Sequence, residues 1–296
     1  MKISVVIPAK NEAAGLKRVL PEIARHMPEA SVYVVDDGSD DDTKEVCRAH
    51  GAFVVEHLIS LGNGAAIKSG ARRATGEILV FMDADGQHKP EDIPRLLSKL
   101  EEGYDMAVGA RSRSSQAGAH RAMANGLYNR LATWMVGQKV EDLTSGFRAV
   151  SAKKFRQFLY LLPNGFSYPT TITMSFFRAG YSVAYVPIVA PARIGKSHIR
   201  LLRDGMRFFL IIFKVGTLYS PLKLFLPISA TFFLTGFGYY LYTFLTIHRL
   251  TTMSAILFIT AIQVFLMGLV SEQISALNYK DSDRATVDGD EDNMQK

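Results

Sequence analysis

Two aspartates and an amide follow a run of apolar residues in the segment FMDADGQHKP, residues 81–90. Asp83 and Asp85 are separated by a single residue, and Gln87 lies two positions further on. Hard oxygen ligands of this kind suit a divalent cation, Mg²⁺ or Mn²⁺, that lies beside a phosphate. The same letters occur at plain polar turns, because Asp and Gly end strands in many proteins. The motif therefore predicts a metal site only if other polar groups converge on it.

Two further polar clusters come directly after runs of strand-forming residues. Lys10 and Glu12 follow residues 3–7, and the sequence DDGS, residues 36–39, follows residues 31–35. Any one cluster could be a turn or a helix cap. Three clusters in one place are harder to explain in that way, because neighbouring carboxylates repel each other unless a cation or hydrogen-bond donors offset them.

The elements that would position these clusters alternate between strand-like and helix-like segments. This order predicts an α/β fold with a mainly parallel sheet and helices on its faces. Ligands of such sheets gather at the carboxyl ends of the strands, so the three clusters should meet at one edge. The expected strands are 3–7, 31–35, 53–56, 78–82 and 106–108, and the expected helices lie near 12–25, 41–49, 62–74 and 91–101.

Composition and charge bound the class of protein. The chain has 296 residues, of which 48% are apolar, so it is too apolar for a disordered protein. The single cysteine, Cys47, excludes an internal disulfide framework. Residues 281–296 hold six acids and two bases, a net charge of −4. Because the whole chain has a net charge of +6, the rest of the chain carries +10. We expect residues 279–296 to be a disordered acidic tail and the basic part to face phosphate ligands or an anionic membrane.

Two uncharged apolar stretches lie near the C-terminus, at 224–247 and 253–271. Each can approach or exceed a hydrocarbon layer of about 30 Å as a helix, and only residues 248–252 join them. We therefore predict a transmembrane hairpin over 221–278. More Lys and Arg residues flank this pair than lie in its connecting loop, which predicts that the large N-terminal part and both termini are cytoplasmic. Before it, cations at Arg200, Arg203, Arg207 and Lys214 share one helical face, so residues 199–220 are predicted to be an interfacial amphipathic helix.

Six motifs in order across residues 3–199 resemble the family 2 glycosyltransferases of the GT-A fold, within the group of polyprenyl-phosphate sugar synthases that includes dolichyl-phosphate mannose synthase. They are VVIPAKNE, VVDDGSDDDT, GNGAAIKSG, FMDADGQH, DLTSGFRA and RIGKSHI. The hairpin is similar to the membrane-anchored branch. This resemblance implies that residues 1–198 form a cytoplasmic GT-A domain. Two departures stand out: His198 occupies a position that is often Lys, and the segment between Arg111 and Arg121 is short.

The resemblance also implies roles for individual residues. Those expected around the donor nucleotide are Pro8, Lys10, Glu12, Val35, Asp37, Lys68, Asp83 and Ala84, with Arg193 and Ser197 on a loop that covers it. The metal would be held by Asp83, Asp85 and Gln87. The acceptor phosphate would lie among Arg111, Arg121, Asn125, Ser145 and Arg148. Catalysis would rest on Asp85, Arg121 and Arg148, with Asp142 either a base or, as we prefer, an arginine-orienting residue.

The implied reaction moves a sugar, with inversion, from a nucleotide-diphospho-sugar to undecaprenyl or dolichyl phosphate at the cytoplasmic membrane face. A lipid phosphate is largely ionised at neutral pH, so it needs cations to hold it rather than a base. Arginine fits because its planar fork grips phosphate oxygens in two places. The segment LGNGAAIKSG favours a UDP-sugar over GDP-mannose, and no nucleic-acid partner is expected. Assembly into homo-oligomers is left open.

Three other interpretations were weighed. The run GNGAAI imitates part of a dinucleotide fingerprint, but it follows the third expected strand and not the first. A small polysaccharide synthase would share the catalytic core, yet the chain lacks a Gln-x-x-Arg-Trp motif, since its only tryptophan, Trp134, lies in LATWMVG. A non-catalytic nucleotide-sugar-binding receptor or scaffold would tolerate loss of the acids and arginines, which are all present here.

Overall fold

The computed structural model describes residues 1–111, 119–165, 167–189, 213 and 216–294. The chain divides into two compact units, Met1–Ile199 and Arg200–Lys296. The predicted interfacial helix at 199–220 lies almost wholly outside the described residues.

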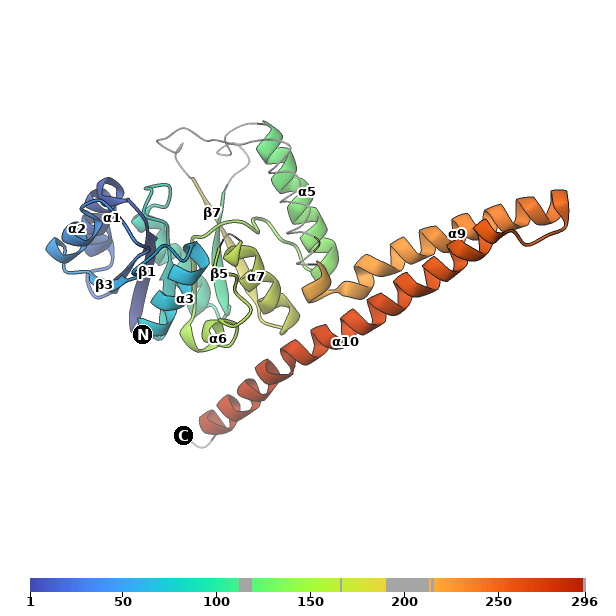
Figure 1. Cartoon of the computed structure of the whole chain (residues 1–296). Helices are drawn as coiled ribbons and strands as arrows, with labels where there is room; N and C mark the ends of the chain where they lie inside the picture. Colours follow the sequence, from blue (N-terminus) through green and yellow to red (C-terminus); the bar gives the residue numbers. More distant parts are fainter. Residues whose placement is uncertain (112–118, 166, 190–212, 214–215, 295–296) are drawn as a thin grey trace. The chain divides into compact units, whose positions relative to one another are not determined.

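A seven-stranded sheet forms the centre of the first unit, in the order β3-β2-β1-β4-β6-β5-β7 (Figure 1). All neighbouring pairs are parallel except the two that involve β6, which runs antiparallel to both β4 and β5. The mainly parallel α/β sheet predicted from the sequence is confirmed. The strands are β1 (Ile3–Ala9), β2 (Ser31–Asp36), β3 (Phe53–Glu56), β4 (Ile78–Phe81), β5 (Met106–Arg111), β6 (Arg148–Ser151) and β7 (Val183–Ile188).

The central strands are mostly apolar because helices cover the sheet, although Ser4 of β1 and Asp36 of β2 are also buried. Val5, Ile7, Val34 and Val80 are completely buried, as expected of parallel strands enclosed on both faces. In register, Val5 lies opposite Val32 on one side and Val80 on the other. Parallel pairing of β1, β2 and β4 places their carboxyl ends at the same edge.

The helices of this unit are buried to different extents: α1 buries one face, whereas nine of the eleven residues of α7 are buried. In α1 the buried residues recur at Leu16, Val19, Leu20 and Ile23, the spacing of an amphipathic helix. Basic residues in its last turn, Arg25 and His26, lie where the helix dipole favours positive charge. The helices are α1 (Ala13–His26), α2 (Thr43–Ala49), α3 (Asn63–Arg73), the 3₁₀ turn η1 (Pro90–Asp92), α4 (Ile93–Glu101), α5 (Ala119–Val136), α6 (Ala152–Arg156) and α7 (Tyr168–Arg178).

The second unit contains two long antiparallel helices, α9 (Pro221–Ile247) and α10 (Thr252–Met294). Segments of 27 and 26 residues, Pro221–Ile247 and Thr252–Leu277, are long and apolar enough to cross a membrane and leave most of their surface outside the protein. Gly236 lets Leu257 approach closely, and Ser229 Oγ donates a hydrogen bond of 2.8 Å to the Ala261 carbonyl. Small residues and a polar contact of this type are common between membrane helices.

The end of α10 differs from the expectation for the tail. Its bounds run to Met294, so the described chain is helical through most of residues 279–296 rather than without secondary structure. A helix that is already nucleated adds residues without paying the nucleation cost again, so even a polar, acid-rich segment can extend it.

Candidate active site

The loops after β1, β2 and β4 meet at one edge of the sheet, as their parallel pairing requires. The Asp37 amide donates to the Ala9 carbonyl at 2.9 Å, and the Met82 amide donates to the Val6 carbonyl at 3.3 Å. The three polar clusters of the sequence therefore lie next to one another.

Asp37 is enclosed by hydrogen-bond donors. It is 5% exposed, and its two carboxylate oxygens accept bonds from His57 Nδ1, Ser60 Oγ and the amides of Leu61 and Gly62, all at 2.7–2.9 Å. Burial by itself would raise the pKa of Asp37, but these bonds, that from His57 foremost, lower it to about 2. Four donors fill the acceptor capacity of a carboxylate. These bonds hold residues 57–62 in place. The contact of Asp37 with a nucleoside stays a prediction.

The loops after β1 and β2 lock into each other. Asn11, with a positive φ of 55°, donates its amide to Ser39 Oγ at 2.9 Å and accepts the Asp40 amide at 2.8 Å. The Ala13 amide donates to Asp41 at 3.1 Å, at the start of α1. Sequence reasoning missed Asn11 and Asp41, although Asn is a usual residue at positive φ. Of the predicted donor residues here, Lys10 is exposed, and Pro8 and Glu12 are half-buried.

The Asp-Ala-Asp turn after β4 is held by its own backbone and by a buried histidine. Asp85 Oδ1 accepts the Gln87 amide at 3.0 Å. His88 Nδ1 accepts the Asp83 amide at 2.9 Å, and its ring stacks on Phe147 with the ring centroids 5.0 Å apart. Burial lowers the pKa of His88, so the ring is neutral, as its accepting role needs. His88 is a site residue that the sequence analysis did not single out.

Close packing sets the position of this turn. A Cβ on Gly15 in α1 would lie 2.1 Å from the Ala84 carbonyl oxygen, so only glycine fits there. Ala84 is 1% exposed and Val35 0%. Both predicted donor residues are therefore buried and shape the site from beneath. Their contact with a donor stays a prediction.

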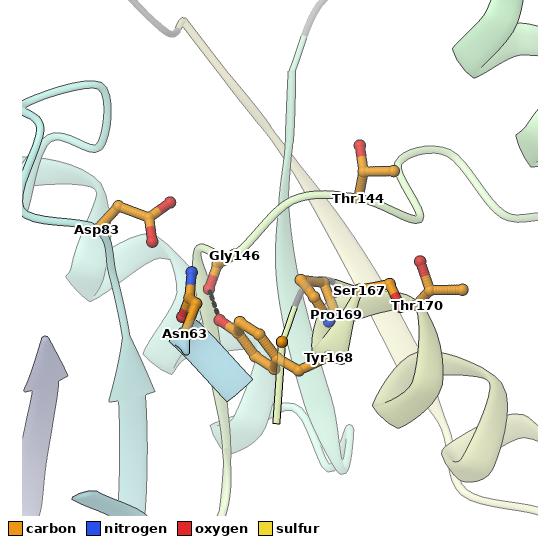
Figure 2. A pocket seen from close by; sticks show the side chains of 9 residues that line it. Asn63, Asp83, Thr144, Gly146, Ser167, Tyr168, Pro169 and Thr170 are labelled. Atoms are coloured by element: carbon orange, nitrogen blue, oxygen red, sulfur yellow. Dashed lines mark hydrogen bonds between the residues drawn. The ribbon is translucent and has the colours of Figure 1, made fainter. Parts of the chain in front are cut away.

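Asp83 lies beside a small pocket of about 90 Å³. Its side chain is 37% exposed and points toward the loop that carries Thr144 and Gly146 (Figure 2). Across the pocket, Tyr168 at the start of α7 donates from its hydroxyl to the Gly146 carbonyl at 3.1 Å. The remaining lining residues are Asn63, Gly165, Ser167, Pro169 and Thr170.

Arg111 and Asp142 form a bidentate ion pair at the end of β5. Arg111 Nε and Nη2 donate to the two carboxylate oxygens at 2.8 and 3.0 Å. Asp142 also accepts the amides of Thr144 and Ser145 at 3.1 Å each. Burial opposes ionisation, but the bonds from Arg111 and these amides keep the pKa of Asp142 below its usual value. A carboxylate held in this way orients an arginine and is a poor general base.

Arg148 is fully buried beneath α7. Nη1 donates to the Pro169 carbonyl at 3.2 Å and to Thr173 Oγ1 at 3.1 Å, and Nη2 donates to the Ser145 carbonyl. Burial lowers the pKa of the guanidinium. The direct phosphate contact expected of Arg148 is thus not open in this conformation. Two buried donors of the predicted acceptor set have no hydrogen-bond partner among the described residues: Arg148 Nε and Ser145 Oγ.

Lys68 is committed to a neighbouring loop and not to the donor edge. Its Nζ donates to the Leu162 carbonyl at 3.1 Å and to Asn164 Oδ1. The amides of Gly64 and Ala65, at the start of α3, donate to the carbonyls of Gly165 and Asn164. The GNGAAIK motif therefore fastens the 162–165 loop onto α3. The donor contact of Lys68 stays a prediction.

Four predicted residues lie where the structure gives no side-chain geometry. Arg121 and Asn125 belong to α5, but only the helical course of the chain is described there. Arg193 and Ser197 lie outside the described residues.

The carboxylates suit a hard cation that a diphosphate would help to hold. Among the described residues, no three His, Cys, Asp or Glu side chains form a metal cluster by themselves. Mg²⁺ needs no such cluster, because one or two carboxylates and the substrate's phosphates usually bind it. Asp83 is partly exposed at the pocket and Asp85 is half-buried in the same turn, so these two carboxylates, with Gln87, are the residues that could hold such a cation.

Comparison with known proteins places these features in a family. Residues 4–159 match the model of glycosyl transferase family 2, and residues 220–277 match the GtrB C-terminal hairpin. The chain is 28% identical over 291 residues to glycosyltransferase AglJ of Haloferax volcanii, covering 93% of this chain and 94% of that one.

Other similarities are partial. Over 162 residues the chain is 36% identical to undecaprenyl-phosphate 4-deoxy-4-formamido-L-arabinose transferase of Klebsiella pneumoniae, 50% of this chain and 48% of the relative. The chain thus spans about half the length of that relative. The structure of glucosyl-3-phosphoglycerate synthase from Mycobacterium tuberculosis with Mn²⁺ and UDP-glucose superposes with a TM-score of 0.59 at 25% identity, covering 73% of this chain and 78% of that one. With its family model spanning more than half of the sequence, the chain belongs to glycosyl transferase family 2.

Proposed function

We propose that the protein transfers a sugar from a nucleotide-diphospho-sugar to a polyprenyl phosphate, with inversion, and releases the nucleoside diphosphate. The observation that carries this proposal is the Asp83–Asp85 turn, with Asp83 open to a pocket, in a chain that ends in two helices of membrane-spanning length. The printed names of the relatives support it, since one acts on undecaprenyl phosphate and a structural neighbour binds UDP-glucose with Mn²⁺. A UDP-sugar is the preferred donor, and GDP-mannose is the alternative.

On the donor side, Asp83, Asp85 and Gln87 would hold Mg²⁺ or Mn²⁺. The metal would supply positive charge to the departing diphosphate. His88 keeps the turn in place through the Asp83 amide, and Gly15 allows α1 to support it from behind. A turn fixed before the ligand arrives loses little order on binding, which is how pre-organised charge lowers a barrier.

On the acceptor side, the phosphate monoester is its own nucleophile. Arg111, oriented by Asp142, and Arg121 and Asn125 on α5 would hold its oxygens, with Ser145 and Arg148 completing the set if α7 shifts. Ser145 Oγ and Arg148 Nε, which have no partner in the part of the chain that the structure describes, support this, because buried donors without a partner are costly and a phosphate oxygen would satisfy them. Asp142 takes no proton in this scheme.

The test is a screen of nucleotide sugars against polyprenyl phosphate with the full chain in membranes, with the lipid product identified by mass. We expect transfer from one donor, dependence on Mg²⁺ or Mn²⁺, and none to the polyprenol that lacks phosphate. Efficient transfer to free polyprenol would overturn the mechanism and make Asp142 the leading candidate for a base. No transfer from any donor, with nucleotide-sugar binding retained, would favour a receptor.

The proposed location is the cytoplasmic membrane, with the catalytic domain and both termini on the cytoplasmic side. Lys214 and Lys223 before the hairpin and Lys280 and Arg284 after it outnumber Arg249 in the loop. A tag on the C-terminus should be cytoplasmic, and one inserted at His248 should lie across the membrane. Exposure of both tags on the same side of intact cells would refute the hairpin topology.

A further inference from the structure

The pocket beside Asp83 lies between the two ends of the proposed reaction. One wall is Asp83 itself, in the turn that would hold the metal and the donor diphosphate. Another wall is Thr144, whose Oγ1 accepts a hydrogen bond of 2.6 Å from Arg111 Nη2 of the expected acceptor site. In an inverting transfer the nucleophile attacks from the face opposite the leaving group, so the sugar must lie between the two. The pocket is therefore where the sugar of the donor would lie.

Two polar side chains of the pocket keep hydrogen-bonding groups for a ligand. Asn63 is the first residue of α3 and Ser167 directly precedes α7, and neither side chain makes a hydrogen bond with the described residues. The hydroxyls of Thr144 and Thr170, which also line the pocket, are already bonded to protein groups. A ligand in the pocket would thus meet a free amide and a free hydroxyl, which are the groups that recognise sugar hydroxyls.

Ser167 has a backbone conformation that serine seldom adopts. Its φ is 83°, in the left-handed region, which favours glycine. The fold holds it there, because the Ser167 carbonyl accepts the Thr171 amide at 3.2 Å in the first turn of α7. Residues strained in this way are concentrated at ligand sites. Glycine would adopt this conformation without strain, so a serine here indicates that its hydroxyl has a role in the pocket.

Asn63 is positioned by close contact between the start of α3 and the loop before α7. An added Cβ on Gly64 would lie 1.9 Å from the Pro163 carbonyl oxygen, so only glycine allows this approach. The starts of α3 and α7 thus meet at the pocket, and Figure 2 shows the Asn63 side chain between Asp83 and Tyr168. Both free polar groups are therefore held in place by the fold.

The size of the pocket limits which substituents the sugar can carry. Its volume is about 90 Å³, room for roughly three water molecules at about 30 Å³ each. It is narrow at Gly146, where an added Cβ would lie 3.2 Å from Asp83 Oδ2 and 3.3 Å from the Tyr168 hydroxyl. This space accepts one hydroxyl-bearing edge of a sugar ring, and an acetamido group on that edge would not fit.

We propose that this pocket binds the sugar of the donor and that Asn63 and Ser167 determine which sugar is accepted, through hydrogen bonds to its hydroxyl groups. The substrate class is then a hexose whose hydroxyls are unmodified on the edge that enters the pocket. A site built to bond a hydroxyl rejects a sugar that directs it elsewhere, because the polar groups of the site are left unpaired. The inference rests on the proposed function, since it takes the donor to be a nucleotide-diphospho-sugar.

The test compares the affinity of each nucleotide sugar with that of its sugar-free nucleotide. UDP-glucose, UDP-galactose and UDP-N-acetylglucosamine would be titrated beside UDP, and GDP-mannose beside GDP, with the full-length protein in detergent and Mn²⁺. Glucose and galactose differ only in the configuration of one hydroxyl. We expect one hexose donor to bind at least about 10-fold more tightly than the other hexose donors. The N-acetylglucosamine group should add nothing to the affinity of UDP.

Two variants remove the polar groups and leave the fold intact. Ser167→Gly keeps the left-handed conformation, and Asn63→Ala keeps a good helix former at the start of α3. In either variant the preference among the hexose donors should fall to within about 3-fold, while the affinity for UDP alone stays unchanged. Asn164→Ala is the matched control, because Asn164 lies in the same loop but bonds to Lys68 and does not line the pocket. It should keep the preference of the wild type.

The outcomes separate this inference from the proposed function. An unchanged preference in both Ser167→Gly and Asn63→Ala would overturn it, as would an equal loss in Asn164→Ala, the absence of any preference in the wild type, or tightest binding of UDP-N-acetylglucosamine. Binding of the donor needs no acceptor. A preference that the two variants abolish, in a protein that transfers no sugar to polyprenyl phosphate, would therefore leave the pocket assignment intact and count against the proposed function alone.

Discussion

Asp37 and Asp83 occupy equivalent places but do different work. Each follows a parallel strand of the same sheet, and each has a histidine beside it. Asp37 is buried and receives four hydrogen bonds, whereas Asp83 keeps its carboxylate at a pocket, and its histidine binds the backbone amide instead. The number of donors that the fold aims at a carboxylate, and not the Asp-rich turn itself, separates an acid that orders a loop from one that stays exposed at a pocket.

The largest effect on sugar transfer should come from the turn after β4 that carries Asp83 and Asp85. Asp85→Ala should lower turnover by at least about 100-fold, since the departing diphosphate loses its counter-charge, while thermal unfolding of the detergent-solubilised protein stays close to that of the wild type. Radiolabelled transfer to lipid measures the first and a melting curve the second. Near-normal transfer, in this variant or in native enzyme with excess chelator, would show that the Asp83–Asp85 turn holds no metal that transfer needs.

Removal of the buried Asp37 carboxylate should mainly lower the stability of the fold. Asp37→Ala leaves the donors of residues 57–62 without their acceptor and should lower the free energy of unfolding by about 2–4 kcal/mol. Asp40→Ala, an exposed acid on the same loop whose side chain makes no described contact, is the control and should be within about 0.5 kcal/mol of the wild type. Equal stability of the two variants would show that the Asp37 network is not structural.

Low pH should remove the stability that the Asp37 carboxylate contributes. The pKa of Asp37 is about 2 in the folded protein, against an ordinary value of 3.8, so the group binds protons less readily when folded than when unfolded. Its contribution, about 2 kcal/mol, is present above pH 4 and is lost as the pH falls toward 2. The stability gap between wild type and Asp37→Asn should therefore narrow between pH 5 and 2. A constant gap in pH-dependent melting would contradict the assigned network.

A smaller loss of stability and transfer should follow when a larger residue replaces Gly15, which packs against the turn after β4. Gly15→Ala puts a Cβ against the Ala84 carbonyl, and the shift of the turn should cost about 1–2 kcal/mol and lower transfer roughly 10-fold. Gly126→Ala, where an added Cβ meets nothing within 4 Å, is the control and should be neutral or slightly stabilising in its helix. Unchanged transfer in Gly15→Ala would mean that the turn is mobile enough to absorb the methyl group.

The sequence predicted what depends on local pattern. Alternating strand and helix signals gave the parallel sheet and the edge at which Asp37, Asp83 and Asp85 gather, and apolar length gave the two helices of the hairpin. It did not predict β6 and β7, because a four-residue antiparallel strand such as Arg148–Ser151 has almost no periodicity to detect.

Local sequence patterns could not predict hydrogen bonds between residues that are far apart in the chain. Lys68 binds residues 94 and 96 positions away, and Arg148 is buried by α7. The sequence could not show these internal contacts, because they join distant parts of the chain. The donors of Asp37 come from a loop more than 20 residues distant. A motif identifies a charged group, but only the tertiary fold shows what it binds.

The insertion of β6 between β4 and β5 has a consequence for synthesis on the ribosome. The edge of β4, four fully buried residues, obtains its second neighbour only when Arg148–Ser151 emerges, about 70 residues after Phe81. At a translation rate of about 5–20 residues per second, this strand edge, with its unpaired N–H and C=O groups, stays open for roughly 4–14 s. Throughout that interval the half-made domain is a target for strand addition by other chains, so chaperone cover during translation should matter more for this protein than its finished fold suggests.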